Sequence, residues 1–245
     1  WALVTTIRLP PEQTRGSAAE PLRPMMDLVR HPGMRSLRTI KAARMSVAHE
    51  LLLEHRPAEL AGVESLEIEH HAALAEMLRE ALAGDGLPKL RELALVGSDY
   101  DRDDFYLLSS KVVRRLDVLS LWQSNARLMQ WIEHLAIPDH RLREVNLSWI
   151  HWYPKPDGWT VTLRPDETGA WSTILVRGSV DRAPRFARQL GVRLLELPPD
   201  TLTRFELRLN GDARAYLPYF REIERGVSHH RHALPSLHHL VAEVV

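Results

Sequence analysis

Five histidines near the C-terminus are the first candidates for metal chemistry in this chain. Imidazoles at close spacing bind Zn²⁺ or Ni²⁺ in many proteins. No Cys or carboxylate lies among these residues, and the segment has the composition of a loop followed by a strand. We therefore predict a solvated segment and no metal site here. The histidines are His229, His230, His232, His238 and His239.

An acidic run at residues 99–104 resembles the opening of a calcium-binding loop. Asp99, Asp101 and Asp103 have the alternating spacing of its first ligands. The sixth position, however, is Asp104 instead of Gly, and the twelfth is Ser110 instead of Glu. Both are needed for the sharp turn and the bidentate ligand. Capping of a helix that begins near Asp103 explains the run better.

Signatures of hydrolytic or nucleotide-dependent chemistry are absent from the sequence. It contains no G-x-S-x-G, no H-E-x-x-H, no G-x-x-x-x-G-K and no G-x-G-x-x-G motif. We therefore predict no catalytic residue, no cofactor and a non-enzymatic role. A deep pocket with convergent titratable groups would be the sign of an enzyme instead.

Aromatic residues are dense in residues 149–159, which read W-I-H-W-Y-P-K-P-D-G-W. Trp and Tyr dominate binding hot spots, because they bury a large area with few rotatable bonds. The alternative is that these rings pack the segment onto the rest of the fold, since large aromatics are mostly buried. We expect Trp149, Trp152 and Tyr153 to contact a partner, together with Trp122 about one repeat earlier.

Apolar residues recur along the chain in the pattern L-x-x-L-x-L, and this repeat indicates which elements position these candidates. It occurs eight times, with intervals of 26, 27, 26, 26, 29, 31 and 35 residues between first positions. Each pattern predicts a strand, and a fixed period in this range is typical of stacked repeats. The segments begin at Leu37, Val63, Leu90, Leu116, Leu142, Trp171, Leu202 and Leu237.

Alternation along each strand places the residues that flank its last two patterned positions on the opposite face of the sheet. The early strands carry acidic residues there and the late strands basic ones, a distribution that can orient a protein partner. The alternative is a solvated face without a partner. The expected partner-contacting residues on this face are Glu67, Glu69, Glu92, Trp122, Glu144, Asn146, Arg177, Arg204 and Arg208, and Glu206 shares it.

Amphipathic segments between the strands predict helices. They are residues 22–30, 47–55, 72–83, 103–111, 126–136, 181–190 and 213–225. Packed helices need a spacing of about 8–10 Å and paired strands about 4.8 Å, so such an array must curve, with its strands on the concave face. Between the fifth and sixth patterns, residues 160–163 and 172–176 alternate around 164–169, which favours a β-hairpin or a strand insertion.

These repeats resemble the leucine-rich repeat family, closest to the helix-bearing repeats of the ribonuclease-inhibitor type. The resemblance is strongest over residues 34–148, although the position that usually holds Asn has Met45, His71, Ser98, Ser124 and Ile150. It implies an α/β horseshoe, a solenoid with parallel strands on the concave face, helices on the convex face and an irregular C-terminal half. We expect a cap (1–33), regular repeats (34–148), an aromatic hairpin insertion (149–170) and irregular repeats (171–245).

Composition limits the partners and the compartment. The chain has 32 basic and 32 acidic residues, so its formal net charge is zero, and we expect no nucleic-acid or anionic-membrane partner. It has no Cys and no apolar run near the ~20 residues that span a bilayer, and we expect no signal peptide, which together favour the cytoplasm. The preference for Arg over Lys indicates a GC-rich, bacterial coding sequence.

The sequence therefore predicts a non-catalytic protein-recognition module that uses the concave face and the aromatic insertion. The alternative is a structural or regulatory repeat subunit of a larger bacterial assembly. The absent initiator Met and the strand-like residues 237–244 support this alternative, since we expect further chain or a partner to cover that edge.

Overall fold

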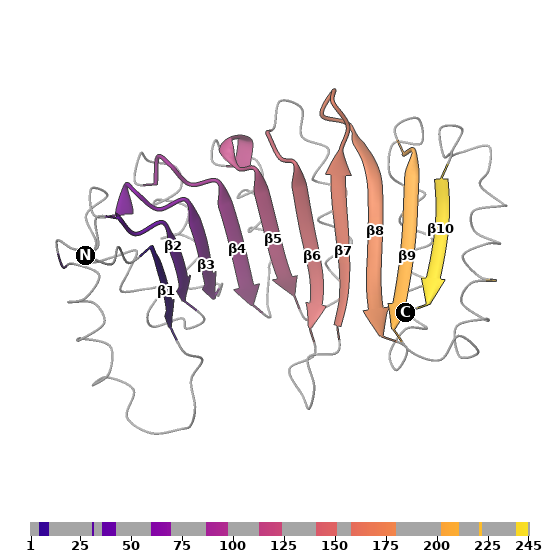
Figure 1. Cartoon of the computed structure of the whole chain (residues 1–245), viewed down its shortest axis with the longest axis horizontal. Coiled ribbons are helices and arrows are strands. Elements are labelled where there is room, and N and C mark those ends of the chain that lie inside the picture. Colours follow the sequence, from indigo (N-terminus) through magenta and orange to yellow (C-terminus); the bar gives the residue numbers. More distant parts are fainter. Residues whose placement is uncertain are drawn as a thin grey trace, which may run out of the picture. The chain divides into compact units, whose positions relative to one another are not determined.

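The computed structural model consists of β-strands over the residues that it describes (Figure 1). These are residues 5–9, 31, 36–42, 60–69, 87–97, 113–123, 141–150, 158–179, 202–210, 221 and 239–244. The chain divides into two compact units, Trp1–Leu121 and Trp122–Val245.

The strands of the first unit follow one another in sequence order. They are β1 (Thr6–Leu9), β2 (Thr39–Ala42), β3 (Ser65–Glu69), β4 (Glu92–Gly97) and β5 (Val118–Gln123), whose last residues lie beyond the boundary. The pairs β1–β2, β2–β3 and β3–β4 are parallel. A short 3-10 helix, η3 (Val113–Arg115), precedes β5.

The second unit contains a mixed arrangement of strands. They are β6 (Glu144–Ile150), β7 (Gly158–Pro165), β8 (Trp171–Ser179), β9 (Arg204–Asn210) and β10 (His239–Val244). Strand β7 runs antiparallel to both β6 and β8, as the direction of its arrow in Figure 1 shows, and the pairs β8–β9 and β9–β10 are parallel.

The patterned apolar residues form the buried face of both units, as the repeat predicts. The first positions of the seven described patterns are 0–7% exposed, from Leu116 at 0% to Trp171 at 7%. Parallel pairing brings equivalent residues of adjacent strands side by side, for example Leu66 with Leu93. Burying one such side chain contributes about 1.5–3 kcal/mol, so the repeated face is a main source of stability.

The strands of the first unit begin with one recurring backbone arrangement. The carbonyl of Thr5 accepts hydrogen bonds from the N–H groups of Arg38 and Thr39, at 2.9 and 3.0 Å. The carbonyls of Arg38, Glu64 and Arg91 each accept two successive N–H groups in the same way. The repeat therefore extends beyond apolar spacing to the hydrogen bonds at each strand start.

The residue before each of these strands alternates in charge along the first unit. The residues are Arg38, Glu64, Arg91 and Asp117. Nε of Arg38 lies 3.2 Å from Oε1 of Glu64, and its Nη1 donates to the carbonyl of Gly62 at 3.3 Å. Arg91 donates in the same manner to the carbonyl of Arg115, also at 3.3 Å. Each arginine thus connects the start of its strand to the turn before the next one.

The turn between β7 and β8 is organised by Asp166. Its Oδ1 accepts hydrogen bonds from N and Oγ1 of Thr168, at 2.8 and 2.6 Å, and from N of Ala170 at 3.1 Å. Gly169 follows with φ 88°, in the left-handed region that glycine adopts without a steric cost. These contacts confirm the predicted hairpin, whose strands extend to Gly158 and Ser179.

The predicted α/β horseshoe is wrong for the part of the chain that the structure describes. This part is a mixed sheet with an antiparallel strand, and it contains no helix that could form a convex layer. The segments predicted as helices lie outside the described residues, apart from Arg221. The physical reason for the error is that L-x-x-L-x-L specifies which side of a strand is buried, and neither its direction nor the layer that covers it.

No helix within the described residues is long and apolar enough to span a membrane.

Candidate functional site

A face rich in polar residues lies opposite the buried residues on β6, β7, β8 and β9 of the second unit. Strand alternation brings its residues together, because Val145, Val161 and Ile174 point to the core. In the register, Asn146 pairs with Thr162, Thr162 with Leu175, and Leu175 with Glu206. We call this surface the polar face. Its residues are Glu144, Asn146, Thr162, Arg164, Leu175, Arg177, Arg204, Glu206 and Arg208.

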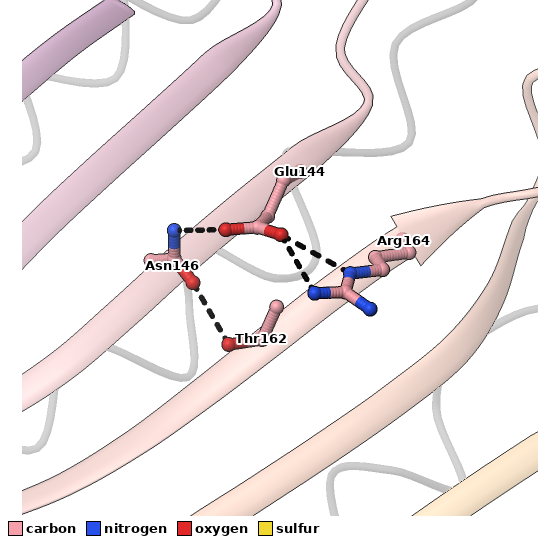
Figure 2. Close-up of polar contacts among 4 residues, drawn as sticks. All are labelled: Glu144, Asn146, Thr162 and Arg164. Atoms are coloured by element: carbon pink, nitrogen blue, oxygen red, sulfur yellow. Dashed lines mark hydrogen bonds and ion pairs between the residues drawn. The ribbon is translucent and has the colours of Figure 1, made fainter.

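Glu144 is the centre of a hydrogen-bonded cluster on β6 and β7 (Figure 2). Its Oε1 accepts from Nδ2 of Asn146 at 2.8 Å, and its Oε2 accepts from Nε and Nη2 of Arg164 at 3.1 and 2.9 Å. Oγ1 of Thr162 donates to Oδ1 of Asn146 at 2.8 Å. The Thr162 side chain is buried on this face, so its hydroxyl needs such a partner.

The contacts of Glu144 keep its carboxyl ionised. Partial burial raises the pKa of Glu144, but the hydrogen bonds from Asn146 and Arg164 and the positive charges of Arg164 and Arg177 outweigh it. The pKa therefore lies below the ordinary value of 4.5. Since Arg177 lies on β8, the field of this one carboxylate reaches across two strands.

Glu206 is the centre of a second cluster, on β9. Arg204 binds Oε1 of Glu206 through Nε and Nη2, and Nη2 of Arg208 lies 3.1 Å from Oε2. Burial raises the pKa of Glu206, and the hydrogen bond and charge of Arg204, with the charge of Arg208, lower it by more. The carboxylate is therefore held ionised between two guanidinium groups of its own strand.

The two clusters expose their positive groups more than their negative ones. The side chain of Arg164 is 56% exposed and that of Glu144 30%. Arg204 and Arg208 are 48% and 41% exposed, above a Glu206 side chain that is 8% exposed. Arg177 is exposed as well. Although each carboxylate has arginine partners, the part of the surface that meets solvent is mainly cationic.

The acidic candidates of the first unit do not join these clusters. Glu67 forms an ion pair with Lys41, whose Nζ lies 3.1 Å from Oε2, and Glu92 is exposed on β4. Glu69 is the last residue of β3. The structure therefore brings Glu144, Asn146, Arg177, Arg204 and Arg208 together on one unit, and places Glu67, Glu69 and Glu92 on the other.

The aromatic candidates lie at strand ends or outside the described residues. Trp122 lies in β5, and Trp149 lies in β6 opposite Trp159 of β7 in the register. Trp152 and Tyr153 lie outside the described residues, within the segment that connects these two strands. The connection therefore starts and ends beside a pair of tryptophan positions.

The chemistry that the polar face can perform is binding of anionic groups through arginines. Arginine forms paired hydrogen bonds with the carboxylate of a ligand. On the polar face, the less exposed carboxylates of Glu144 and Glu206 already fix the orientation of the arginine side chains. Among the described residues, no group of three or more His, Asp or Glu side chains could hold a metal ion. Of the five histidines, only His239 is a described residue, in β10, and residues 99–104 lie outside the described part.

Two hydrogen-bonding residues of the polar face, Thr162 and Arg164, are missing from the sequence-based candidates, as is the apolar Leu175. Alternation with the buried Val161 and Leu163 would have placed both on this face. The sequence pattern instead predicts that Arg164 begins the turn, whereas β7 continues to Pro165. A register shift at Arg164 and Pro165 ends the regular pairing there, as expected for a residue without an N–H group.

Comparison of the chain with protein-family models, with curated proteins and with solved structures found no match.

Proposed function

We propose that this chain is a non-catalytic protein-recognition module whose binding surface is the polar face. The observation that carries the proposal is the layering of charge, with half-exposed arginines above carboxylates that are less exposed. Arginine is enriched in protein interfaces. Side chains that are already held in one conformation before binding lose less conformational entropy on association. A face whose side chains are tied by mutual hydrogen bonds has this property.

The aromatic connection between β6 and β7 extends this proposed surface. Its ends are fixed by the pairing of Trp149 with Trp159, on strands that also carry Glu144 and Arg164. Trp152 and Tyr153, which lie outside the described residues, are its proposed aromatic contacts, and such rings provide much of the binding energy in protein interfaces.

The proposed partner is a protein, and the proposed location is the cytoplasm. The zero formal net charge supports a protein over nucleic acid or an anionic membrane, because both polyanions select a basic excess. The lack of Cys fits a reducing compartment.

Affinity capture of the tagged full chain from a lysate of its source organism, read by mass spectrometry, tests the proposal. The variants are Arg177→Glu/Arg204→Glu on the polar face and Trp152→Ala in the connection. The control is Arg114→Glu, which reverses the charge of an exposed arginine of η3 in the first unit. We expect a specific partner that the control retains and the polar-face variant loses.

Two outcomes contradict the proposal. Capture of no specific partner by the wild-type chain argues against recognition of any kind. Capture of one stable complex by all variants equally places the contact elsewhere, and favours a structural or regulatory subunit of a larger bacterial assembly. Thermal melting of each variant separates lost binding from lost folding.

A further inference from the structure

Two arginines of like charge lie side by side on the polar face. In the parallel pairing of β8 with β9, Arg177 is the direct neighbour of Arg208. Adjacent strands lie about 4.8 Å apart, and like charges directly opposite each other destabilise a sheet. Arg177 is exposed, and the Arg208 side chain is 41% exposed. Glu206 and Glu144 offset part of this repulsion, and an anionic group that binds both guanidinium groups from the exposed side would offset more of it.

Glu206 holds the neighbouring cations in place without covering them. It contacts Arg204 on one side and Arg208 on the other, and its own side chain is only 8% exposed. A guanidinium group is large, with five N–H donors on three nitrogen atoms, and part of each group remains exposed while it contacts Glu206. Glu206 is therefore a positioning residue, and the exposed surfaces of Arg204 and Arg208 face outward.

The cations are arranged at a defined spacing. Arg204 and Arg208 bind the two oxygens of the Glu206 carboxylate, so their guanidinium groups converge and lie much closer together than the about 13 Å between the two positions along the strand. In an extended peptide the residues i and i+2 point to the same side and lie about 7 Å apart, which is nearer to this spacing. Carboxylates at i and i+2 would therefore meet the converging arginines together, whereas carboxylates at i and i+3 would point to opposite sides.

We propose that the polar face binds an extended acidic segment of a protein partner, with carboxylates on Arg204 and on the Arg177–Arg208 pair. This inference rests on the proposed function and specifies its partner. The acidic groups on the face favour a peptide over nucleic acid. Glu144, whose side chain is 30% exposed, interrupts the positive surface, so a continuous phosphate backbone would meet like charge there, whereas a peptide can place its carboxylates only where arginines lie.

Fluorescence anisotropy with the full chain and labelled peptides tests the inference. One peptide carries Glu at positions i and i+2 in a Ser and Gly background, and a second has the same composition with Glu at i and i+3. We expect the first to bind more tightly. Arg177→Glu and Arg208→Glu should each weaken the binding of this peptide at least about tenfold. The milder Arg177→Gln should weaken it by a smaller factor, and the control Arg114→Glu should bind it normally.

Glu206→Gln distinguishes positioning from simple charge attraction. The variant makes the face more positive, so attraction alone predicts tighter binding of the acidic peptide. Positioning predicts weaker binding, because the amide no longer holds Arg204 and Arg208 by charge. We expect weaker binding with an unchanged near-ultraviolet circular dichroism spectrum, and tighter binding would overturn the positioning role.

Three results would overturn the acidic-segment assignment. They are no binding of either peptide by the wild-type chain, equal affinity for both peptides, and equal or tighter binding of a single-stranded oligonucleotide of the same charge. If the lysate partner is still lost in Arg177→Glu/Arg204→Glu but the peptide does not compete with it, recognition stands and only this inference fails. If no lysate partner exists, the proposed function fails as well.

Discussion

Glu144 and Glu206 are carboxylates that stay ionised on a sheet face although they are partly or largely buried. Burial disfavours the charged form of each, and arginines on the same or the next strand more than compensate. Exposed ion pairs contribute only about 0–1 kcal/mol, whereas loss of one partner from a buried pair leaves an uncompensated charge. These ion pairs therefore contribute more to the positions of the arginine side chains than to the free energy of unfolding.

The hydrogen bond between Asn146 and Thr162 should be measurable as a coupling. Asn146→Ala removes the acceptor of the Thr162 hydroxyl, whose residue is 8% exposed, so we expect a loss of about 1–3 kcal/mol. Thr162→Val removes the hydroxyl itself. In urea unfolding the double variant should lose less than the sum of the two single losses. Strict additivity would mean that this hydrogen bond does not form.

Gly169 should tolerate Asn better than Ala. At φ 88° an L side chain is strained, and no atom lies within 4 Å of the position where a Cβ would stand, so the cost is one of backbone conformation alone. We expect Gly169→Ala to lower the free energy of unfolding by about 1–2 kcal/mol, and Gly169→Asn by less, since Asn adopts this region more readily. Equal losses would contradict this explanation.

At the scale of elements, the sequence predicts the strands and their buried sides well, because period-two alternation directly reports which side chains face the core. Leu90, Leu93 and Leu95 are buried as expected, and the hairpin around residues 164–169 forms. The alternating charges of Arg38, Glu64, Arg91 and Asp117 are a further regular signal in the sequence, since each residue directly follows the first patterned residue of its repeat.

The strand register has a direct test in adjacent residues of β4. Leu93 is 2% exposed, so Leu93→Ala should lower the free energy of unfolding by about 2–5 kcal/mol. Glu92 is exposed on the opposite face, and Glu92→Ala should change it by less than about 0.5 kcal/mol. Because a slip by one residue exchanges the two faces, the reverse order of effects would show that the register is wrong.

At the scale of the whole molecule, the sequence-based prediction was wrong about the direction of the strands and about a layer of helices that covers them. A strand that ends in buried residues has the same alternation whether its neighbour is parallel or antiparallel, so the antiparallel pairing of β7 with β6 could not be predicted from its pattern alone. The candidate site was partly predictable, because Glu144, Asn146, Arg177, Arg204 and Arg208 follow from alternation. The ion pair of Glu144 was not, since its partner Arg164 depends on where β7 ends.

Carboxyls with lowered pKa values give the second unit a defined response to acid. Glu144, Asp166 and Glu206 all lie there, and for each the folded-state pKa is below its ordinary value of 4.5 for Glu or 3.8 for Asp. At neutral pH their contribution to stability is complete. As the pH falls below those ordinary values, the unfolded chain takes up protons first, so stability declines until the folded-state pKa values are passed.

Urea unfolding followed by circular dichroism at about pH 6 and about pH 3 measures this response. We expect the free energy of unfolding of the wild-type chain to be lower at the acidic pH. The double variant Glu144→Gln/Glu206→Gln should have a lower free energy of unfolding than the wild-type chain at the higher pH. Its free energy of unfolding should also fall less on acidification, because two of the groups that take up protons are gone. An equal loss in the variant and the wild-type chain would mean that other carboxyls dominate the acid response, and that the arginine clusters hold these two more weakly than their contacts indicate.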